Sequence, residues 1–97
     1  MRKEISLYTR AADKFKALAH PARLRLVARL MEEECCVGDI QECLCLSQPN
    51  VSQHLKVLRE AGIIQGKRDK NRICYRMADK AITEAIEIIL KGENSNG

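Results

Sequence analysis

Two amphipathic segments follow one another in this sequence with only Cys45 and Leu46 between them. Apolar residues recur every three or four positions in residues 37–44 and again in residues 51–58, which is the period of a helix with one buried face. Ser47 is a favourable N-cap for the second segment. A link of two residues makes the two helices direct neighbours, so the pattern predicts a helix-turn-helix unit.

The segments on either side of this pair extend the pattern. Residues 11–18 and 21–31 both show helical apolar spacing, and Pro21 separates them because proline fits a first turn but cannot continue a preceding helix. Residues 63–77 contain two β-rich runs around a polar turn, which predicts a hairpin. Asp79 can then cap a last amphipathic helix.

The predicted order of elements is helix, helix, short helix, helix, hairpin, helix, which is that of a winged helix-turn-helix. This is a mostly α fold with a small β-hairpin (α+β), and we expect it over residues 1–91, with a disordered tail at 92–97. A chain of 97 residues makes one domain with a modest core. No apolar run approaches the ~20 residues of a membrane helix, and the N-terminus does not resemble a signal peptide. We therefore expect a cytoplasmic protein without a membrane partner.

Charge is divided unevenly between two parts of the chain. Residues 47–76 contain seven basic residues against Glu60 and Asp69, whereas residues 32–46 contain five acidic residues and no basic one. A concentrated positive region suits a polyanion such as nucleic acid.

The exposed face of the second helix of the pair is rich in amides and hydroxyls. Gln and Asn side chains can hydrogen-bond base edges in two directions, and Ser can reach phosphates or bases. Basic residues on this helix and on the hairpin can neutralise backbone phosphates. The predicted contacts to double-stranded DNA are Ser47, Gln48, Asn50, Ser52, Gln53, Lys56, Arg59, Lys67, Arg68, Lys70 and Arg72.

On these residues the chain resembles the ArsR/SmtB (arsenic-repressor) family of transcriptional regulators. The matching stretches are ALAHPARLRL at residues 17–26, VGDI at 37–40, LSQPNVSQHLKVLREAG at 46–62 and YR at 75–76. The resemblance spans roughly residues 11–90 and implies a homodimeric repressor that leaves its operator when an inducer binds. Family members pair through the first and last helices, which implies dimerisation through Phe15, Ile82, Ala85, Ile86 and Ile89.

The five cysteines are candidates for sensing the inducer. Their odd number and the lack of a secretion signal argue against a disulfide framework. Soft thiolates suit As(III), Sb(III) or a soft divalent metal ion, and the neighbouring carboxylates attract cations. We expect Cys35 and Cys36 to bind such an inducer, with Cys43, Cys45 and Cys74 as secondary candidates. No cofactor is expected for DNA binding itself.

The sequence departs from the family's marked sensor patterns. The arsenite-sensing branch has Cys-x-Cys before the third helix, where this chain has Cys36-Val37-Gly38. The zinc-sensing branch uses histidine on the last helix, and persulfide-sensing members use cysteines on the second and last helices. This sequence has none of these residues at those places. Inducer, operator and regulated genes therefore stay open.

Two alternatives remain beside the metalloid sensor. The same repressor could be a thiol-redox sensor, acting through a disulfide or persulfide, although local negative charge slows oxidation by anionic reagents. Alternatively, the winged helix could serve only protein–protein contact. Single cysteines are also often small buried hydrophobes. His20 is expected at a helix boundary, and His54 is expected to pack or touch a phosphate. The sequence has no catalytic motif, so we do not expect an enzyme.

Overall fold

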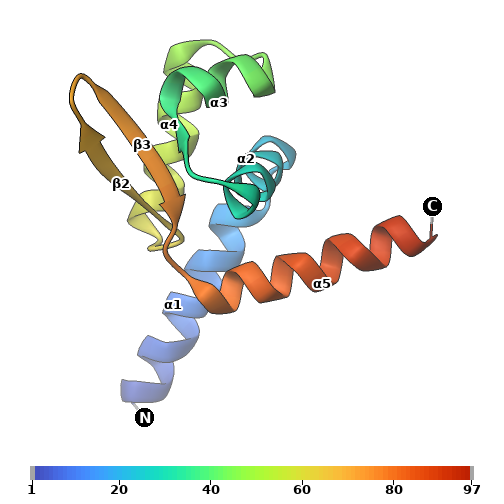
Figure 1. Cartoon of the computed structure of the whole chain (residues 1–97). Helices are drawn as coiled ribbons and strands as arrows, with labels where there is room; N and C mark the ends of the chain where they lie inside the picture. The colour runs from blue at the N-terminus through green and yellow to red at the C-terminus, as the bar shows by residue number, and fades with distance from the viewer. Residues whose placement is uncertain (1, 97) are drawn as a thin grey trace.

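A computed structural model describes residues 2–96 of the chain, with side-chain environments for residues 5–95. It contains five helices and three short strands among these residues (Figure 1). In chain order they are α1 (Arg2–Leu18), α2 (Pro21–Glu32), β1 (Cys35–Cys36), α3 (Val37–Leu44), α4 (Gln48–Glu60), β2 (Ile64–Asp69), β3 (Arg72–Met77) and α5 (Lys80–Asn96). The predicted winged helix-turn-helix is confirmed.

The boundary between α1 and α2 forms as the sequence predicts. His20 has extended backbone geometry, and its Nδ1 accepts a hydrogen bond of 3.0 Å from the backbone N–H of Ala22. Pro21 occupies the first turn of α2, where its missing N–H costs no helical hydrogen bond. The histidine is therefore a helix cap, which agrees with its expected boundary role.

The turn between α3 and α4 is closed by backbone geometry. Cys45 takes a left-handed conformation with φ of 55°, and its backbone N–H reaches back to the carbonyl oxygens of Gln41 and Glu42. Such a left-handed residue ends a helix abruptly because it satisfies the last free carbonyl groups. The chain can then start α4 after only Leu46 and Ser47.

Three antiparallel strands form the wing sheet in the order β1-β3-β2. The hairpin of β2 and β3 was predicted, and its turn uses Lys70 at φ of 59°. Strand β1 was not predicted. It pairs Cys35 with Tyr75 and Cys36 with Cys74, so it joins the start of α3 directly to the wing.

The core lies where α2, α3, α4 and the base of the hairpin meet. Apolar side chains from all of them are almost completely buried, and most are aliphatic because the chain has only three aromatic residues, of which Tyr75 lies in the core. The largest of them are Leu26, Val27, Ile40, Val51, Leu55, Leu58, Ile63 and Ile64.

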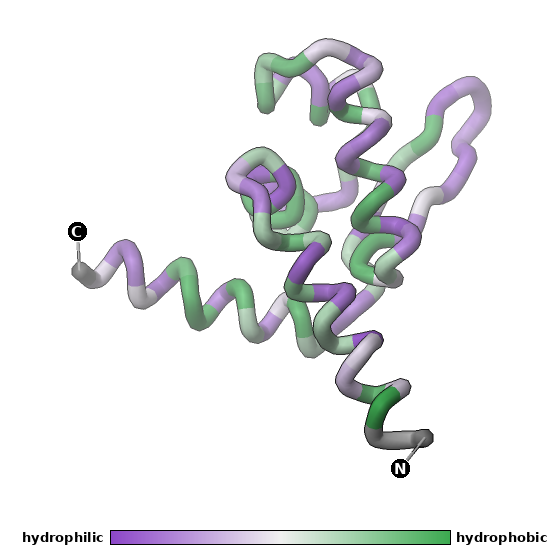
Figure 2. The backbone as a smooth tube through the Cα atoms, turned by 180° about the vertical axis from the view of Figure 1, so that it is seen from behind, coloured by the Kyte–Doolittle hydropathy of each residue, from purple (hydrophilic) through white to green (hydrophobic). Residues whose placement is uncertain are grey.

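Helices α1 and α5 extend away from this core in Figure 1. Figure 2 shows apolar residues recurring along α5 beyond the body of the molecule. Large apolar side chains are exposed on both helices, among them Ile5, Tyr8 and Phe15 on α1 and Ile88 and Ile89 on α5.

Two predictions for the last helix differ from the structure. Ile82 and Ile86, expected at a dimer interface, are 8% and 3% exposed and pack into the core of their own chain. The predicted disordered tail is helical from residue 92 to residue 96, because extending an existing helix by a few residues needs no new nucleation. No helix within residues 2–96 is long and apolar enough to span a bilayer.

Asp79 joins the two projecting helices. Its Oδ1 accepts from the backbone N–H of Ile82 at 3.0 Å, and its Oδ2 accepts from Lys14 Nζ on α1 at 2.6 Å. The hydrogen bond from Lys14 and those from the helix backbone hold the pKa of Asp79 below its ordinary value, although partial burial opposes them. The predicted cap of the last helix is confirmed.

We expect Asp79→Ala to lower the free energy of unfolding at pH 7 by about 1–2 kcal/mol, because the α5 cap is lost. Asp79→Asn, which can still cap but carries no charge, should lose less. Because the folded pKa is lowered, the stabilisation by the carboxylate is present above its unfolded pKa and disappears as pH falls through its folded pKa.

Urea unfolding of the wild type, both variants and the control Glu84→Gln, at pH 7 and pH 3, measures this effect. A difference between wild type and Asp79→Asn that is equally large at both pH values would contradict the proposed charge contribution.

Candidate nucleic-acid interface and cysteine pair

Helix α4 is held by one face and exposes the other. Ser47 Oγ accepts from the backbone N–H of Asn50 at 3.4 Å, which confirms the predicted N-cap. Val51, Leu55 and Leu58 are at most 2% exposed and fix the rotation of the helix about its axis. The polar side of α4 therefore has to face solvent.

The side chains predicted to contact DNA lie at the surface. All of them, on α4 and on the hairpin, are exposed. In particular, Gln53 and Lys56 are not packed inside the molecule. Their roles in binding remain predictions, but nothing in the packing opposes them.

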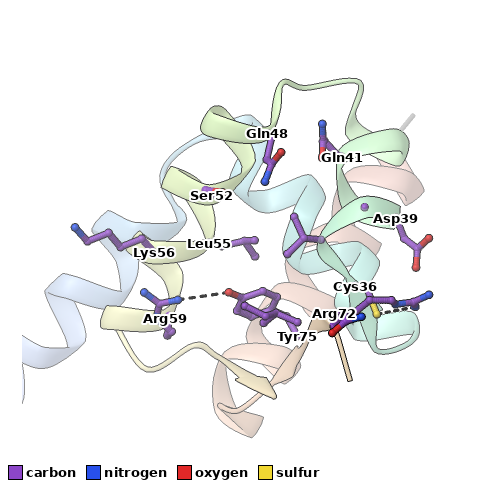
Figure 3. Close-up of a pocket in the computed structure, with 14 residues that line it drawn as sticks. Cys36, Asp39, Gln41, Gln48, Ser52, Leu55, Lys56, Arg59, Arg72 and Tyr75 are labelled. Atoms are coloured by element: carbon purple, nitrogen blue, oxygen red, sulfur yellow. Dashed lines mark hydrogen bonds between the residues drawn. The ribbon is translucent and has the colours of Figure 1, made fainter. Parts of the chain in front are cut away.

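A groove of about 670 Å³ lies between α3, α4 and the wing. Figure 3 shows that α4 contributes Gln48, Ser52, Lys56 and Arg59 to one wall. The opposite side is built from the start of α3 and from the wing, including Arg72. The fold thus brings helix and hairpin residues that were predicted separately to one concave surface.

Tyr75 lies beneath this groove and supports one of its basic residues. The ring is 5% exposed, and its hydroxyl accepts from Arg59 Nη1 at 3.4 Å (Figure 3). A Cβ at Gly66 would stand 2.8 Å from Tyr75 Cε1, which is too close. Glycine on β2 therefore leaves room for the ring that connects the wing to α4.

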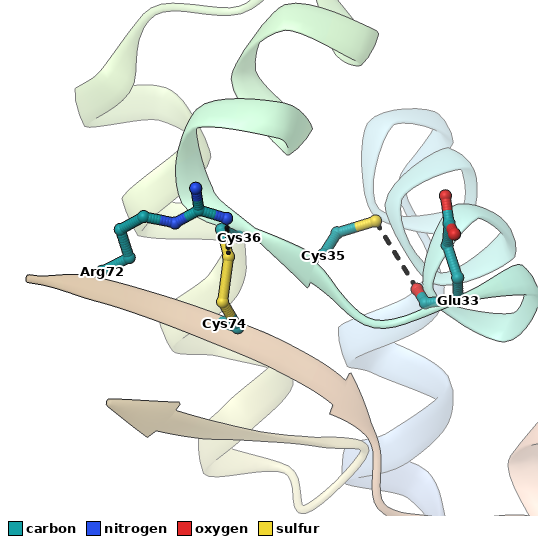
Figure 4. Close-up of a disulfide and its surroundings, with 5 residues drawn as sticks. All are labelled: Glu33, Cys35, Cys36, Arg72 and Cys74. Atoms are coloured by element: carbon teal, nitrogen blue, oxygen red, sulfur yellow. Dashed lines mark hydrogen bonds between the residues drawn. A yellow bond between two sulfur atoms is a disulfide. The ribbon is translucent and has the colours of Figure 1, made fainter. Parts of the chain in front are cut away.

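Cys36 and Cys74 form a disulfide between β1 and β3. Their Cα atoms are 3.8 Å apart, although the two residues are 38 positions apart in sequence. Arg72 Nη2 donates to Cys36 Sγ at 2.9 Å, and Figure 4 shows the guanidinium beside that end of the disulfide. The bond ties the start of the helix-turn-helix to the wing.

Cys35 projects away from this pair, towards α2 (Figure 4). Its side chain is buried and donates to the carbonyl oxygen of Glu33 at 3.5 Å. Burial raises the pKa of the Cys35 thiol, while nearby Arg29 partly opposes that rise. Successive residues of a strand point to opposite faces, so Cys35 and Cys36 do not converge on a common point as the metal-site prediction requires.

The remaining two cysteines, Cys43 and Cys45, are not part of the disulfide. Cys43 and Cys45 are exposed free thiols on α3 and at its C-cap. Among residues 5–95, no three His, Cys, Asp or Glu side chains are gathered closely enough to suggest a metal site. The structure therefore brings together Cys36, a first candidate, and Cys74, a secondary one, and the sequence did not predict this pair because it did not predict strand β1.

The rings of His54 and His20 lie side by side in a tilted arrangement. Their ring centroids are 4.7 Å apart, and His54 Nδ1 accepts from Arg23 Nε at 3.3 Å. Partial burial and the nearby charges of His20 and Arg23 lower the pKa of His54. A neutral His54 packed between helices agrees with the expectation that it packs.

Comparison with known proteins agrees with this architecture. Residues 20–65 match the model of bacterial regulatory proteins of the arsR family. The biofilm growth-associated repressor of Agrobacterium fabrum is 43% identical over 81 residues, which cover 84% of this chain and 69% of that protein.

Two solved structures extend the likeness. The transcriptional repressor BigR from Xylella fastidiosa superposes with a TM-score of 0.80 at 33% identity, covering 94% of each chain. The homodimeric winged helix-turn-helix DNA-binding domain Mb0332 from Mycobacterium bovis shares the fold, with a TM-score of 0.91 at 22% identity, and covers 99% of this chain and 89% of that one. This chain therefore belongs to the ArsR family of regulatory proteins, which are not enzymes.

Proposed function

We propose that this chain is a transcriptional repressor that binds operator DNA with α4 in the major groove and the wing on the flanking backbone. The observation that carries the proposal is the groove that Gln48, Ser52 and Lys56 of α4 line together with Arg72 of the wing. A recognition helix and a basic hairpin on one surface can engage base edges and phosphates together. The Agrobacterium and Xylella relatives are both repressors.

The proposed repressor acts as a homodimer. Phe15 on α1 and Ile88 and Ile89 on α5 are 67%, 71% and 59% exposed, although all three are large and apolar. A second copy would cover them, and Ile82 and Ile86 would hold α5 in place from within the chain. The homodimeric state of the Mycobacterium bovis domain supports this assembly. Two symmetric subunits would place two α4 helices on successive half-sites.

We further propose that oxidation of Cys36 and Cys74 releases the repressor from DNA. The two residues are partners in the sheet, so their disulfide needs no large rearrangement. When the thiols are oxidised, two protons and two electrons pass to a low-molecular-weight disulfide, which becomes two thiols. The new bond holds the wing against the start of α3, and this restricts the wing's adjustment to the duplex.

Binding of As(III), Sb(III) or a soft divalent ion is the second candidate for the inducing event. The specific observation in its favour is again the proximity of Cys36 and Cys74, because two reduced thiolates side by side are good soft ligands. Cys35, which lies on the other face of β1, would have to move to join them.

For DNA binding, we expect Lys56→Ala to weaken all duplexes alike and to reduce the slope of log K against log[salt] by about one. Gln53→Ala should instead relax sequence preference, by about 1–3 kcal/mol at one base pair. Fluorescence anisotropy with a duplex selected from a random library, and with its scrambled version, measures both. Absence of salt-dependent binding to any duplex would favour a protein-interaction module instead.

For the dimer, Ile89→Glu should weaken self-association at least about tenfold, because it places a charge in an apolar interface. Sedimentation equilibrium measures the change, and operator affinity should fall with it. Lys91→Gln on the same helix is the control and should remain dimeric. An Ile89→Glu protein that stays fully dimeric at wild-type concentrations would refute the proposed interface.

For the inducer, adding a small disulfide to the reduced protein should weaken operator binding at least about tenfold, and dithiothreitol should restore it. Cys36→Ser and Cys74→Ser should each abolish the response, whereas Cys43→Ser with Cys45→Ser should keep it. Parallel titrations with arsenite, antimonite and Cd(II) separate the two candidates. Release by these ions without release by disulfides would reject the oxidation mechanism.

A further inference from the structure

The two cysteines of the disulfide line different hollows of the surface. Cys36 lines the groove between α4 and the wing, together with Arg72. Cys74 lines a smaller hollow of about 290 Å³ next to Glu34, Lys67 and Asp69. A reagent that enters the groove meets Cys36 first, whereas a reagent that enters the smaller hollow meets Cys74 first.

The groove beside Cys36 is positively charged. Its ionisable lining consists of Lys56, Arg59 and Arg72 against the single carboxylate of Asp39. The guanidinium of Arg72 lies 2.9 Å from Cys36 Sγ. Within residues 5–95, no carboxylate lies within ion-pair distance of any of the three basic side chains. Their charge is therefore available to an incoming anion.

The hollow beside Cys74 has the opposite balance. Glu34 and Asp69 outnumber Lys67 there. The negative surroundings that the sequence predicts for the cysteines as a group therefore apply to Cys74 and not to Cys36. Because the two hollows are lined by opposite net charge, a charged reagent is attracted to one cysteine of the pair more than to the other.

We propose that the groove admits an anionic low-molecular-weight disulfide, one whose two halves carry carboxylate or phosphate groups, and that Cys36 is the thiol that attacks it. This inference rests on the proposed redox function and names its substrate class. Arg59 and Arg72 bind the anionic groups of the reagent through charge-assisted hydrogen bonds. This brings its S–S bond to Cys36 rather than to Cys74.

The exchange has two balanced steps. The Cys36 thiolate attacks one sulfur of the reagent and forms a mixed disulfide, while the other half leaves as a thiolate with the electron pair. The Cys74 thiolate then attacks Cys36 Sγ, the intramolecular bond forms, and the second half leaves as a thiolate. The two protons of the cysteines end on the two released thiols, and the reagent has been reduced by two electrons.

The same charges are proposed to bind operator phosphates. A bound duplex would therefore occupy the groove and keep the reagent away from Cys36. Oxidation would act on repressor molecules that have dissociated from the operator, and because the oxidised product cannot rebind, the operator is vacated as dissociation proceeds. Competition for one set of basic residues thus links DNA occupancy to the rate of oxidation.

The test measures mixed-disulfide formation in the reduced full-length chain with either Cys74→Ser or Cys36→Ser, so that the adduct on the remaining partner is trapped. The probes are glutathione disulfide (anionic), hydroxyethyl disulfide (neutral) and cystamine (cationic), and peptide mass mapping locates each adduct. The ratio of anionic to cationic rates is compared between Cys36 and Cys74. This comparison cancels the intrinsic reactivity of each reagent and the thiolate fraction of each cysteine.

At low ionic strength we expect this ratio to be about tenfold larger at Cys36 than at Cys74, and to shrink towards equality as salt is added. Arg72→Gln should reduce the ratio at Cys36, whereas Arg25→Gln, which removes an exposed arginine of α2 that does not line the groove, should not. Addition of duplex DNA should slow the anionic reagent at Cys36 most.

Equal ratios at the two cysteines, or a ratio unchanged by Arg72→Gln, would overturn the inference. These outcomes are distinct from failure of the proposed function, which would appear as oxidation of the pair without any change in operator affinity. A charge-selective reaction at Cys36 together with unchanged DNA binding would reject only the regulatory role.

Discussion

Burial of the apolar stripe of α4 is the interaction on which the remaining surface depends. The stripe consists of Val51, Leu55 and Leu58, which pack against apolar side chains of the other helices and of the hairpin base. This packing fixes the rotation of α4 about its axis. Polar residues interleaved with that stripe are thereby presented outward at fixed angles. If the stripe were shifted forward by one residue, Ser52, Lys56 and Arg59 would enter the core, and the groove would lose most of its α4 wall.

The local features of the structure follow from short-range patterns in the sequence. The helical period of residues 37–58, the caps at Ser47 and Asp79 and the hairpin were all predictable, because each depends on residues that are close in sequence. The exposed positions of α4 followed from the same period. The function of these positions rests on their chemistry and on the resemblance to a family.

Contacts between distant segments were not predictable in this way. Strand β1 has only two residues and forms because it pairs with β3. The sequence therefore contains no run of β-forming residues that would predict it. The pairing of Cys36 with Cys74 and the separation of Cys35 from Cys36 both follow from that register. Similarly, the apolar positions of α5 indicate a buried face without saying whether it meets its own chain, as Ile82 and Ile86 do, or a second copy.

The ion pair of Lys14 with Asp79 has a mechanical consequence. Asp79 comes two residues after the end of β3, so the base of the wing, the first turn of α5 and the side of α1 meet at one carboxylate. We therefore expect a small tilt of either projecting helix to move the base of the wing, because Asp79 is bonded to both helices and only Ala78 separates it from β3. In the proposed homodimer, the position of each wing would then depend on how the helices of the two subunits pack together. The distance between the two wings would be set by that packing.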